Sequence, residues 1–237
     1  MSQTGFKIDE AGLTLDRSRQ TLADLTADKL REFILLEKLP AGAPIVERDI
    51  AAALGISRTP LRAALSILEQ EKLVDYSVTR RPRVANPSLE DISQNTVVMG
   101  TLEALAGELA CANASDQEIT KALALIDQME RDSNRIAALD FFRVDMEMHE
   151  TIVRASRNDA LIDTHRQYNA RLWRARFLSS RRNAGRDQTL AEHRRIGDAL
   201  RLRDGKATAD AMRIHMSSAI TNITAALAEQ TDTPAAE

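Results

Sequence analysis

The chain of 237 residues is long enough for one large or two modest domains, each with its own buried core. Ala and Leu dominate an apolar fraction of 43%, whereas aromatic residues account for only 3%, a composition that favours helices over sheets. The net charge of −3 excludes a polycation that binds nucleic acid over its whole surface, so any DNA contact must come from a local basic patch.

Cysteine usage and the N-terminal segment indicate where the protein works. Cys111 is the only cysteine, which excludes an intrachain disulfide and suits a reducing compartment. The first ten residues are polar and acidic, unlike a signal peptide, and no apolar run approaches the length needed to cross a bilayer. We therefore expect a soluble cytoplasmic protein without a membrane partner.

The first third of the chain predicts three helices. Residues 1–18 lack any periodicity and are expected to form a flexible arm, whereas apolar residues recur at helical spacing over 21–39. A short helix over 46–53 follows. A third helix begins near Ser57 or Thr59, because Thr59 followed by proline is typical of an N-cap with proline in the first turn.

Glycine, proline and valine residues indicate turns and a hairpin around these helices. Gly55 lies in the tight turn before the third helix, where a positive φ is easiest for glycine. The third helix is expected to end near Lys72. Residues 73–84 contain valine and tyrosine on either side of a break at Arg80-Arg81-Pro82, a pattern typical of a small β-hairpin.

An interruption at Asn86-Pro87-Ser88 divides the chain into two domains. We assign residues 19–87 to the first domain and residues 88–229 to the second, and we expect a frayed tail over 230–237. Beyond the boundary the helical pattern is nearly continuous. The six expected helices are 88–114, 115–133, 137–156, 159–180, 188–203 and 206–228. The fold class is therefore mostly α, with an antiparallel all-helical bundle as the second domain.

The first domain has the element order of a winged helix-turn-helix, in which the third helix enters the major groove of DNA. Arg58 and Arg62 are four residues apart at the start of that helix, so both project from one face toward base edges or phosphates. Between Arg48 and Arg83, seven Lys or Arg stand against four Asp or Glu, a local excess of three positive charges. The alternative is a three-helix unit for protein contacts whose arginines are solvated. The candidate DNA contacts are Arg48, Ser57, Arg58, Thr59, Arg62, Arg80 and Arg81.

The run Leu54-Gly55-Ile56-Ser57-Arg58-Thr59-Pro60-Leu61-Arg62 resembles the DNA-binding domain of the GntR family of bacterial transcription regulators. The resemblance implies that the arginines of this run and Arg48 contact operator DNA together with the wing. Operators read by such proteins are usually two-fold, so we expect a homodimer. Two positions depart from the family pattern: Lys72 stands where the helix ordinarily ends in glycine, and Arg81 replaces a glycine at the wing tip.

Three histidines of the second domain could join a carboxylate around a metal ion. Asp145 and His149 are one helical turn apart and share a face, with Cβ atoms ~6 Å apart. His193 and His215 lie on the last two expected helices, among apolar residues. Three imidazoles and one carboxylate suit Zn, Ni or Mn, with open positions for a ligand oxygen. Spacing alone leaves open that these are ordinary core or surface histidines.

The same positions resemble the FCD domain, the ligand-binding half of the FadR-like subgroup of GntR regulators. The matching residues are Leu102-Glu103, Asp145, His149, Glu192-His193 and His215. The resemblance implies that Asp145, His149, His193 and His215 hold one divalent metal, first of all Zn. It also implies that this metal receives the carboxylate of an organic-acid or sugar-acid effector. Six helices after the domain boundary are similar to the VanR-type branch.

One position of the effector site departs from the pattern of this family. Met99 stands four residues before Glu103, where many FCD domains carry an arginine that helps to hold the effector carboxylate. Another cation is one possible substitute, and residues 166–186 contain seven arginines and no acidic residue. We name Arg171 and Arg174 as candidate effector contacts. Most arginines of this segment are expected on a helix face turned to solvent, a partner subunit or DNA.

The sequence therefore predicts a DNA-binding transcription regulator that is controlled by a small carboxylate effector at a metal site. The alternative is a metal-dependent enzyme that uses the same Asp/His site. Glu147 and Glu150, the nearest candidate general bases, point away from the face that carries Asp145 and His149. An enzyme would also leave the DNA-binding half unexplained. A third hypothesis is a purely structural metal, whose removal would unfold the protein instead of abolishing an effector response.

Overall fold

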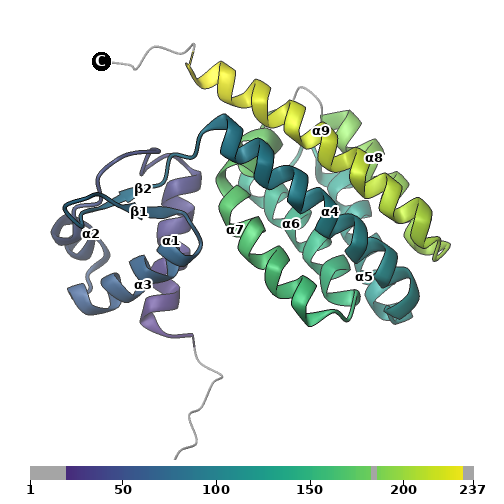
Figure 1. Ribbon diagram of the computed structural model, residues 1–237, viewed down its shortest axis with the longest axis horizontal. Coiled ribbons are helices and arrows are strands. Elements are labelled where there is room, and N and C mark those ends of the chain that lie inside the picture. The colour runs from purple at the N-terminus through teal and green to yellow at the C-terminus, as the bar shows by residue number, and fades with distance from the viewer. Residues whose placement is uncertain (1–19, 183–185, 232–237) are drawn as a thin grey trace, which may run out of the picture.

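The computed structural model describes residues 20–182 and 186–231, and these residues are mostly helical, as the composition predicts. They form nine helices and a two-stranded hairpin, divided between an N-terminal unit and a larger helical unit (Figure 1). The expected arm over 1–18 lies outside the described residues, as do residues 232–237 of the expected tail. Within the described part of the chain, no helix combines the length and the apolar character that a membrane span requires.

The N-terminal unit closes around one apolar core. Its elements are α1 (Leu22–Leu35), α2 (Glu47–Leu54), α3 (Arg58–Gln70), β1 (Val74–Tyr76) and β2 (Pro82–Val84). At the start of α1, Thr21 and Asp24 form a capping box, in which each backbone N–H donates to the other side chain. Leu30 of α1 and Leu61 and Leu65 of α3 are fully buried in this core. The predicted winged helix-turn-helix is confirmed.

Left-handed backbone positions shape the turns of this unit. Gly55 ends α2 with a φ of 66°, which glycine adopts without strain. Lys72 follows the end of α3 with a φ of 61°, so it occupies the left-handed position that glycine ordinarily fills at a helix C-terminus. At the wing tip, Arg80 has a φ of 55°, whereas Arg81 does not have a positive φ. The position that favours glycine therefore lies one residue before the expected one.

The start of α3 and the wing differ slightly from expectation. Ser57 is the N-cap of α3, so Thr59 lies within the first turn of the helix. β1 and β2 pair antiparallel, with Val74 opposite Val84, and both valines are buried. The residues between the two strands are exposed or half-buried and form the tip of the wing.

The larger unit is an antiparallel bundle of six helices. These are α4 (Leu89–Asn113), α5 (Asp116–Asp132), α6 (Ala138–Ala155), α7 (Asp159–Ser180), α8 (Arg186–Arg201) and α9 (Gly205–Thr231). Each coincides with one of the six expected helices to within a few residues. α9 continues past residue 228, where we expected it to end, so the first two residues of the expected tail are helical.

Close packing of α4 against α9 forms one side of this bundle (Figure 1). A Cβ atom on Gly107 would lie 2.8 Å from Cγ2 of Thr208, so only glycine allows α9 to approach this closely. α8 packs between α9 and α5, and α5 packs against α6. This arrangement turns the inner faces of α6, α8 and α9 toward one another.

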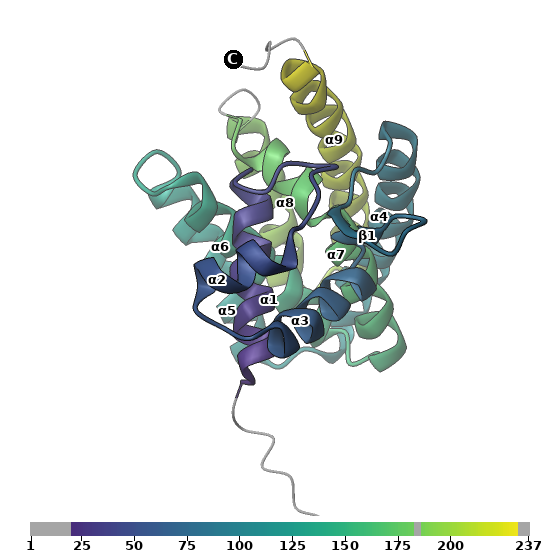
Figure 2. The same ribbon diagram turned by 90° about the vertical axis from the view of Figure 1, so that its left-hand side faces the viewer.

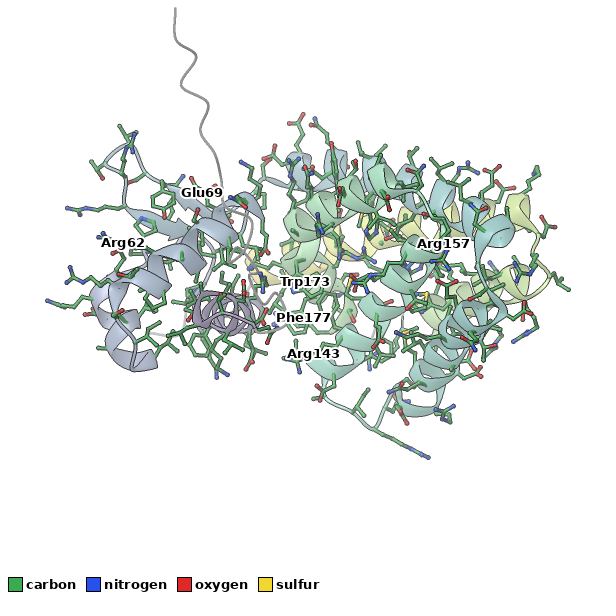
Figure 3. All side chains as sticks on the ribbon, turned by 90° about the horizontal axis from the view of Figure 1, so that it is seen from below. Arg62, Glu69, Arg143, Arg157, Trp173 and Phe177 are labelled. Atoms are coloured by element: carbon green, nitrogen blue, oxygen red, sulfur yellow. The ribbon has the colours of Figure 1, made fainter. Side chains whose placement is uncertain are left out.

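The end of α1 joins the two units. In Figure 2 the N-terminal unit lies in front of the helical bundle. Leu35, the last residue of α1, is only 4% exposed. It belongs to an apolar cluster with Phe142, Met146 and Phe177 of the bundle, in which the two phenylalanine rings meet edge-on. Trp173 packs both against this cluster and against the core of the N-terminal unit, and Figure 3 shows it at the junction. We call this cluster the Leu35 socket.

An ion-pair cluster lies beside the Leu35 socket. Glu37, just after α1, has one carboxylate oxygen 3.1 Å from Nη2 of Arg174 and the other 3.1 Å from Nη1 of Arg181. The Arg174 side chain is 16% exposed, so solvent screens this pair less than a surface ion pair. Arg174 lies in the C-terminal part of α7 and Arg181 is its C-cap, so these ion pairs connect α7 to the N-terminal unit.

Candidate functional site

Four side chains from three helices converge inside the bundle. Asp145 and His149 come from α6, His193 from α8 and His215 from α9, and all four are buried. One ring nitrogen from each of the three histidines lies within 4.8 Å of the others. The Oδ1 atom of Asp145 lies 3.4 Å from Nε2 of His149 and 3.3 Å from Nε2 of His193. The Nε2 atoms of His193 and His215 are 3.3 Å apart. We call these four residues the Asp–His cluster.

The spacing of these atoms fits a single metal ion. Ligands at about 2.0–2.2 Å from one ion are separated by roughly 3.0–3.5 Å in tetrahedral or octahedral geometry. The separations from Asp145 Oδ1 and between His193 and His215 fall in this range. Asp145 Oδ1 and His149 Nε2 are buried and have no well-aligned hydrogen bond to any described residue. Buried polar atoms in proteins are rarely left this way unless an ion or water satisfies them.

Two further carboxylates orient the histidines from behind. Oε2 of Glu103, from α4, lies 2.7 Å from Nδ1 of His149. Oε2 of Glu192, from α8, lies 3.1 Å from Nδ1 of His215. Because a carboxylate lies beside Nδ1 of each ring, Nε2 of each ring faces the centre of the cluster, an arrangement typical of metal-binding histidines. Sequence reasoning used both glutamates only as marks of a family resemblance and missed this role.

A buried charge network surrounds Glu103. Its Oε1 atom lies 3.1 Å from Nη1 of Arg176 and 3.3 Å from Nε2 of His165. Burial alone would raise the pKa of Glu103, but the charges of His149 and Arg176 outweigh it and hold this pKa well below the ordinary value. Arg176 and His165, both on α7, are functional-site residues that the sequence analysis did not identify. Glu103 therefore stays ionised and tethers α4, α6 and α7 to one another.

The histidines of the cluster have opposite pKa shifts. Burial lowers the pKa of His149, but the adjacent Glu103 carboxylate outweighs burial and raises it to about 9. Burial and the neighbouring His215 lower the pKa of His193 to about 3. For Asp145, burial would raise the pKa, but the adjacent His149 and His193 side chains outweigh burial and lower this pKa below the ordinary value. The cluster thus contains an ionised carboxylate and a neutral His193, both suited to ligate a cation.

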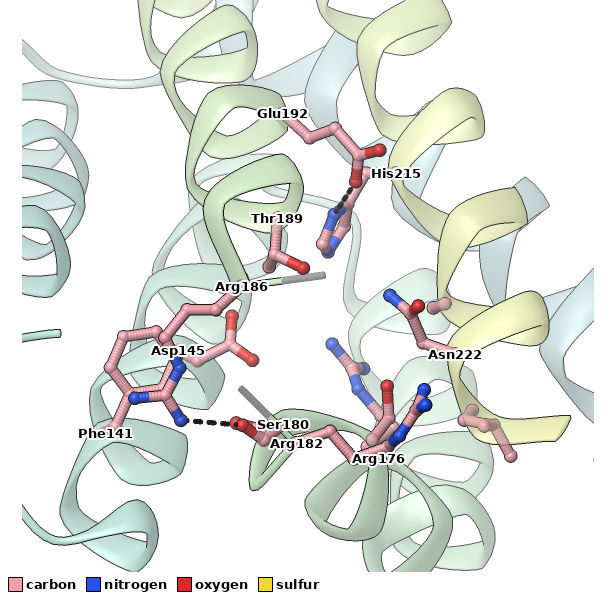
Figure 4. A pocket seen from close by; sticks show the side chains of 13 residues that line it. Phe141, Asp145, Arg176, Ser180, Arg182, Arg186, Thr189, Glu192, His215 and Asn222 are labelled. Carbon is pink, nitrogen blue, oxygen red and sulfur yellow. Dashed lines mark hydrogen bonds and ion pairs between the residues drawn. The ribbon is translucent and has the colours of Figure 1, made fainter. Parts of the chain in front are cut away.

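A cavity opens beside the cluster, between the C-terminal end of α7, the start of α8 and the middle of α9 (Figure 4). It holds about 580 Å³ of space, counting its mouth toward solvent. Asp145 and His215 border one part of it, and three arginines border the rest. The polar and charged lining residues are Asp145, Arg176, Ser179, Ser180, Arg182, Arg186, Thr189, Glu192, His215 and Asn222.

The arginines named from the sequence lie elsewhere. Arg171 lies over the ring of Tyr168 and borders a cleft near the domain boundary, and Arg174 pairs with Glu37. Neither lines the cavity beside the Asp–His cluster, and α7 presents Arg176 there instead. Met99 is fully buried in an apolar cluster with Leu172 and Met216, so it does not contact the cavity.

The candidate DNA contacts lie on exposed surface of the N-terminal unit. Arg58 and Arg62 are both exposed at the start of α3, and Nε of Arg62 donates to Oε2 of Glu47 over 2.8 Å. Figure 3 shows Arg62 on the side of this unit that faces away from the helical bundle. Ser57 and Thr59 flank Arg58 and are exposed, as are Arg48 of α2 and Arg80 and Arg81 of the wing. Val78 at the wing tip is fully exposed.

Known families match both units. The family model for bacterial regulatory proteins of the gntR family matches residues 22–84, and the FCD domain model matches residues 96–218. An uncharacterized HTH-type transcriptional regulator in an unstable DNA locus of Streptomyces ambofaciens is 31% identical over 201 residues, which cover 82% of each chain. A probable D-xylose utilization operon transcriptional repressor of Paenarthrobacter nicotinovorans is 26% identical and covers 85% of this chain and 90% of that protein.

Solved structures share the same fold. McbR/YncC from E. coli aligns with a TM-score of 0.74 at 17% identity and covers 90% of this chain and 100% of that one. A putative transcriptional regulator GntR from Rhodococcus sp. RHA1 aligns with a TM-score of 0.69 at 23% identity, covering 86% of this chain and 97% of that one. The matched families and relatives are transcriptional regulators and not enzymes, which argues against the metal-dependent enzyme. The chain belongs to the GntR family of bacterial regulatory proteins and combines that family's DNA-binding domain with an FCD domain.

Proposed function

We propose that this regulator changes its operator affinity when a small carboxylate effector binds a divalent metal ion in its FCD domain. The observation that carries the proposal is the Asp–His cluster, whose four ligand atoms converge beside a cavity lined by arginines. A purely structural metal would need no such cavity. The six helices after the domain boundary support assignment to the VanR-type branch.

Asp145, His149, His193 and His215 would hold the ion, as metals are held in some FCD domains. One carboxylate and three imidazoles suit Zn first, with Ni and Mn as alternatives. When bound, such an ion supplies a Lewis-acidic centre that attracts a carboxylate oxygen. Glu103 and Glu192 keep the Nε2 atoms of His149 and His215 directed at this position.

The effector end of the protein can influence the DNA-binding end through α6. Phe141 and Asp145, one turn apart, line the cavity, whereas Phe142 and Met146 belong to the Leu35 socket. Two adjacent faces of the same helical turn therefore serve the two sites. If effector binding shifts this turn, the packing of Leu35 in the Leu35 socket changes, and with it the position of the DNA-binding domain.

The helix α7 likewise contacts both the cavity and the Leu35 socket. Arg176 faces the cavity and Glu103, while Trp173 and Phe177 pack in the Leu35 socket. The ion pairs from Arg174 and Arg181 to Glu37 add a charged contact to the same junction. Packed helices with two alternative arrangements are the usual means by which a ligand biases a distant domain.

For DNA, we propose that Arg58 and Arg62 read base edges and that Arg48, Ser57, Thr59, Arg80 and Arg81 contact the backbone or adjacent bases. The local excess of three positive charges and the exposure of these side chains support this. We further propose a cytoplasmic homodimer on a two-fold operator. The exposed apolar residues Val97 and Leu105 of α4 and Ile214 of α9 support a subunit contact through the FCD domain.

A binding experiment tests the proposed function. Full-length protein is loaded with Zn and titrated onto an operator that was selected for binding to the wild type, with and without small organic acids and sugar acids. At least one acid should change operator affinity, and chelation of the metal should abolish that change while DNA binding persists. A metal-loaded protein whose operator affinity no carboxylate alters, and to which no carboxylate binds, would contradict the proposal.

A further inference from the structure

A second set of polar atoms lines the same cavity and comes from residues outside the Asp–His cluster. Oγ of Ser180 and Nε of Arg186 are buried there and have no hydrogen-bond partner among the described residues. The two groups are neighbours, because Nη2 of Arg186 donates to the backbone carbonyl of Ser180 over 3.0 Å. Two sets of unsatisfied polar atoms beside one cavity, one in the Asp–His cluster and one at Ser180 and Arg186, indicate a ligand with two polar groups.

The Arg186 side chain is held rigidly beside this cavity. Its guanidinium group donates to the backbone carbonyls of Ser133 and Ser180, and it lies over the ring of Phe141, 4.5 Å from the ring centroid. Within residues 20–182 and 186–231 it forms no ion pair with a carboxylate, and its contacts there are carbonyl dipoles and the ring. A preorganised guanidinium group of this kind is suited to bind an anion.

The charges around the cavity also favour a ligand with two acid groups. Arg176 already pairs with Glu103, so its charge is balanced. Among the other lining residues, Arg182 and Arg186 contribute two positive charges, and Asp145 and Glu192 contribute two negative charges. A divalent ion in the Asp–His cluster adds two positive charges. One carboxylate neutralises only half of this excess, whereas an effector with two acid groups neutralises all of it.

We propose that the effector carries two acid groups, one at the Asp–His cluster and the second beside Ser180, Arg182 and Arg186. This inference rests on the proposed function, because it assumes that the first acid group binds the metal. Figure 4 shows Arg176 and Arg182 on the side of the cavity opposite Glu192 and His215.

A matched pair of ligands tests the proposal. Succinate and its monoamide, succinamate, have nearly the same shape and differ by one negative charge. Each is titrated into Zn-loaded full-length protein by calorimetry, together with the longer diacid glutarate. We expect at least one of the two diacids to bind ten times more tightly than succinamate or more, because the amide cannot form a charge-assisted pair with an arginine.

A substitution tests whether the preference for a diacid depends on Arg182. Arg182→Gln should weaken binding of the diacid tenfold or more and leave succinamate binding within about twofold. Arg166→Gln is the control, because Arg166 lies on the same arginine-rich segment but is exposed, pairs with Asp163 and does not line the cavity. The thermal midpoint of each variant verifies that it is folded.

The outcomes separate this inference from the proposed function. Binding of succinamate as tight as that of both diacids, or equal losses for both ligand types in Arg182→Gln, would overturn the two-acid effector while the metal-bound carboxylate stands. Failure of a wider set of mono- and dicarboxylates to bind the Zn-loaded wild type would overturn both.

Discussion

Leu35 is the residue at which coupling between the two domains can be tested most selectively. It ends α1 in the DNA-binding domain, yet its side chain is 4% exposed and buried by Phe142, Met146 and Phe177 of the FCD domain. Leu→Ala substitutions at buried sites cost about 2–5 kcal/mol, with lower values where the surroundings can close the gap. Since a junction between domains can close in this way, we expect Leu35→Ala to weaken docking of the two domains by about 2–3 kcal/mol.

The consequence is a loss of coupling and not of either site. A change of about 2–3 kcal/mol alters the docking equilibrium roughly 30- to 150-fold. The variant should therefore retain its metal and its effector affinity and bind the operator without effector, while the effector-induced change in operator affinity shrinks. Fluorescence anisotropy with a labelled operator, with and without effector, measures this change.

The neighbouring residue supplies a matched control. Leu36 is 38% exposed and follows Leu35 directly, so Leu36→Ala removes the same atoms from a more solvated position. This control should respond to effector like the wild type. A full effector response in Leu35→Ala would refute the coupling route through the Leu35 socket.

Three further predictions concern DNA, assembly and pH. Arg58→Ala or Arg62→Ala should each weaken operator binding by ~1–3 kcal/mol without unfolding the protein, whereas Arg81→Ala should mainly lower the salt dependence of binding. Gel-shift titrations test this, and unchanged operator affinity in both α3 variants would remove the recognition-helix assignment. The fragment from residue 88 onward should be a folded dimer by light scattering, and a monomer at micromolar concentration would contradict the proposed interface. Metal affinity should rise with pH up to about 9, because a histidine must be neutral to bind a metal and Glu103, which outweighs burial, raises the pKa of His149 to about 9. In metal-competition titrations, an affinity that stays constant between pH 6 and 9 would refute this.

Much of the fold could be predicted from the sequence because its signals are local. Helical spacing of apolar residues gave all nine helices, and Gly55 has the positive φ that its turn requires. The departures also have local causes. Lys72 adopts the left-handed conformation although it is not glycine, and the wing places Arg80 and not Arg81 in that conformation. A hairpin register is fixed by cross-strand pairing, which the spacing of single residues does not reveal.

The site was harder to predict where it depends on tertiary contacts. The Asp145–His149 pair could be predicted because residues i and i+4 share a helix face. Spacing alone left open whether His193 and His215 join this pair, and the resemblance to a family strengthened that assignment. Their ring nitrogens do converge with those of His149. The roles of Glu103 and Arg176 could not be read, since they depend on contacts between α4, α6 and α7.

The two arginines of α7 named from the sequence do not line the cavity, and there is a physical reason for this. This helix is buried on several sides and carries charged residues around its circumference, so its sequence does not reveal which face meets the cavity. Arg174 and Arg176 are two residues apart and therefore point in very different directions. The first meets Glu37 at the domain junction, and the second meets Glu103 beside the cavity.

Metal content is the measurement that tests the central claim most directly. Protein purified without chelator is analysed by elemental mass spectrometry, alongside His193→Ala, His215→Ala and the control Arg166→Gln, which alters an exposed residue of α7 that pairs with Asp163. We predict one divalent ion per subunit in the wild type and the control, and a marked loss in both alanine variants, which still fold and bind the operator. A wild type that carries no stoichiometric metal and cannot be reloaded with Zn, Ni or Mn would contradict the account.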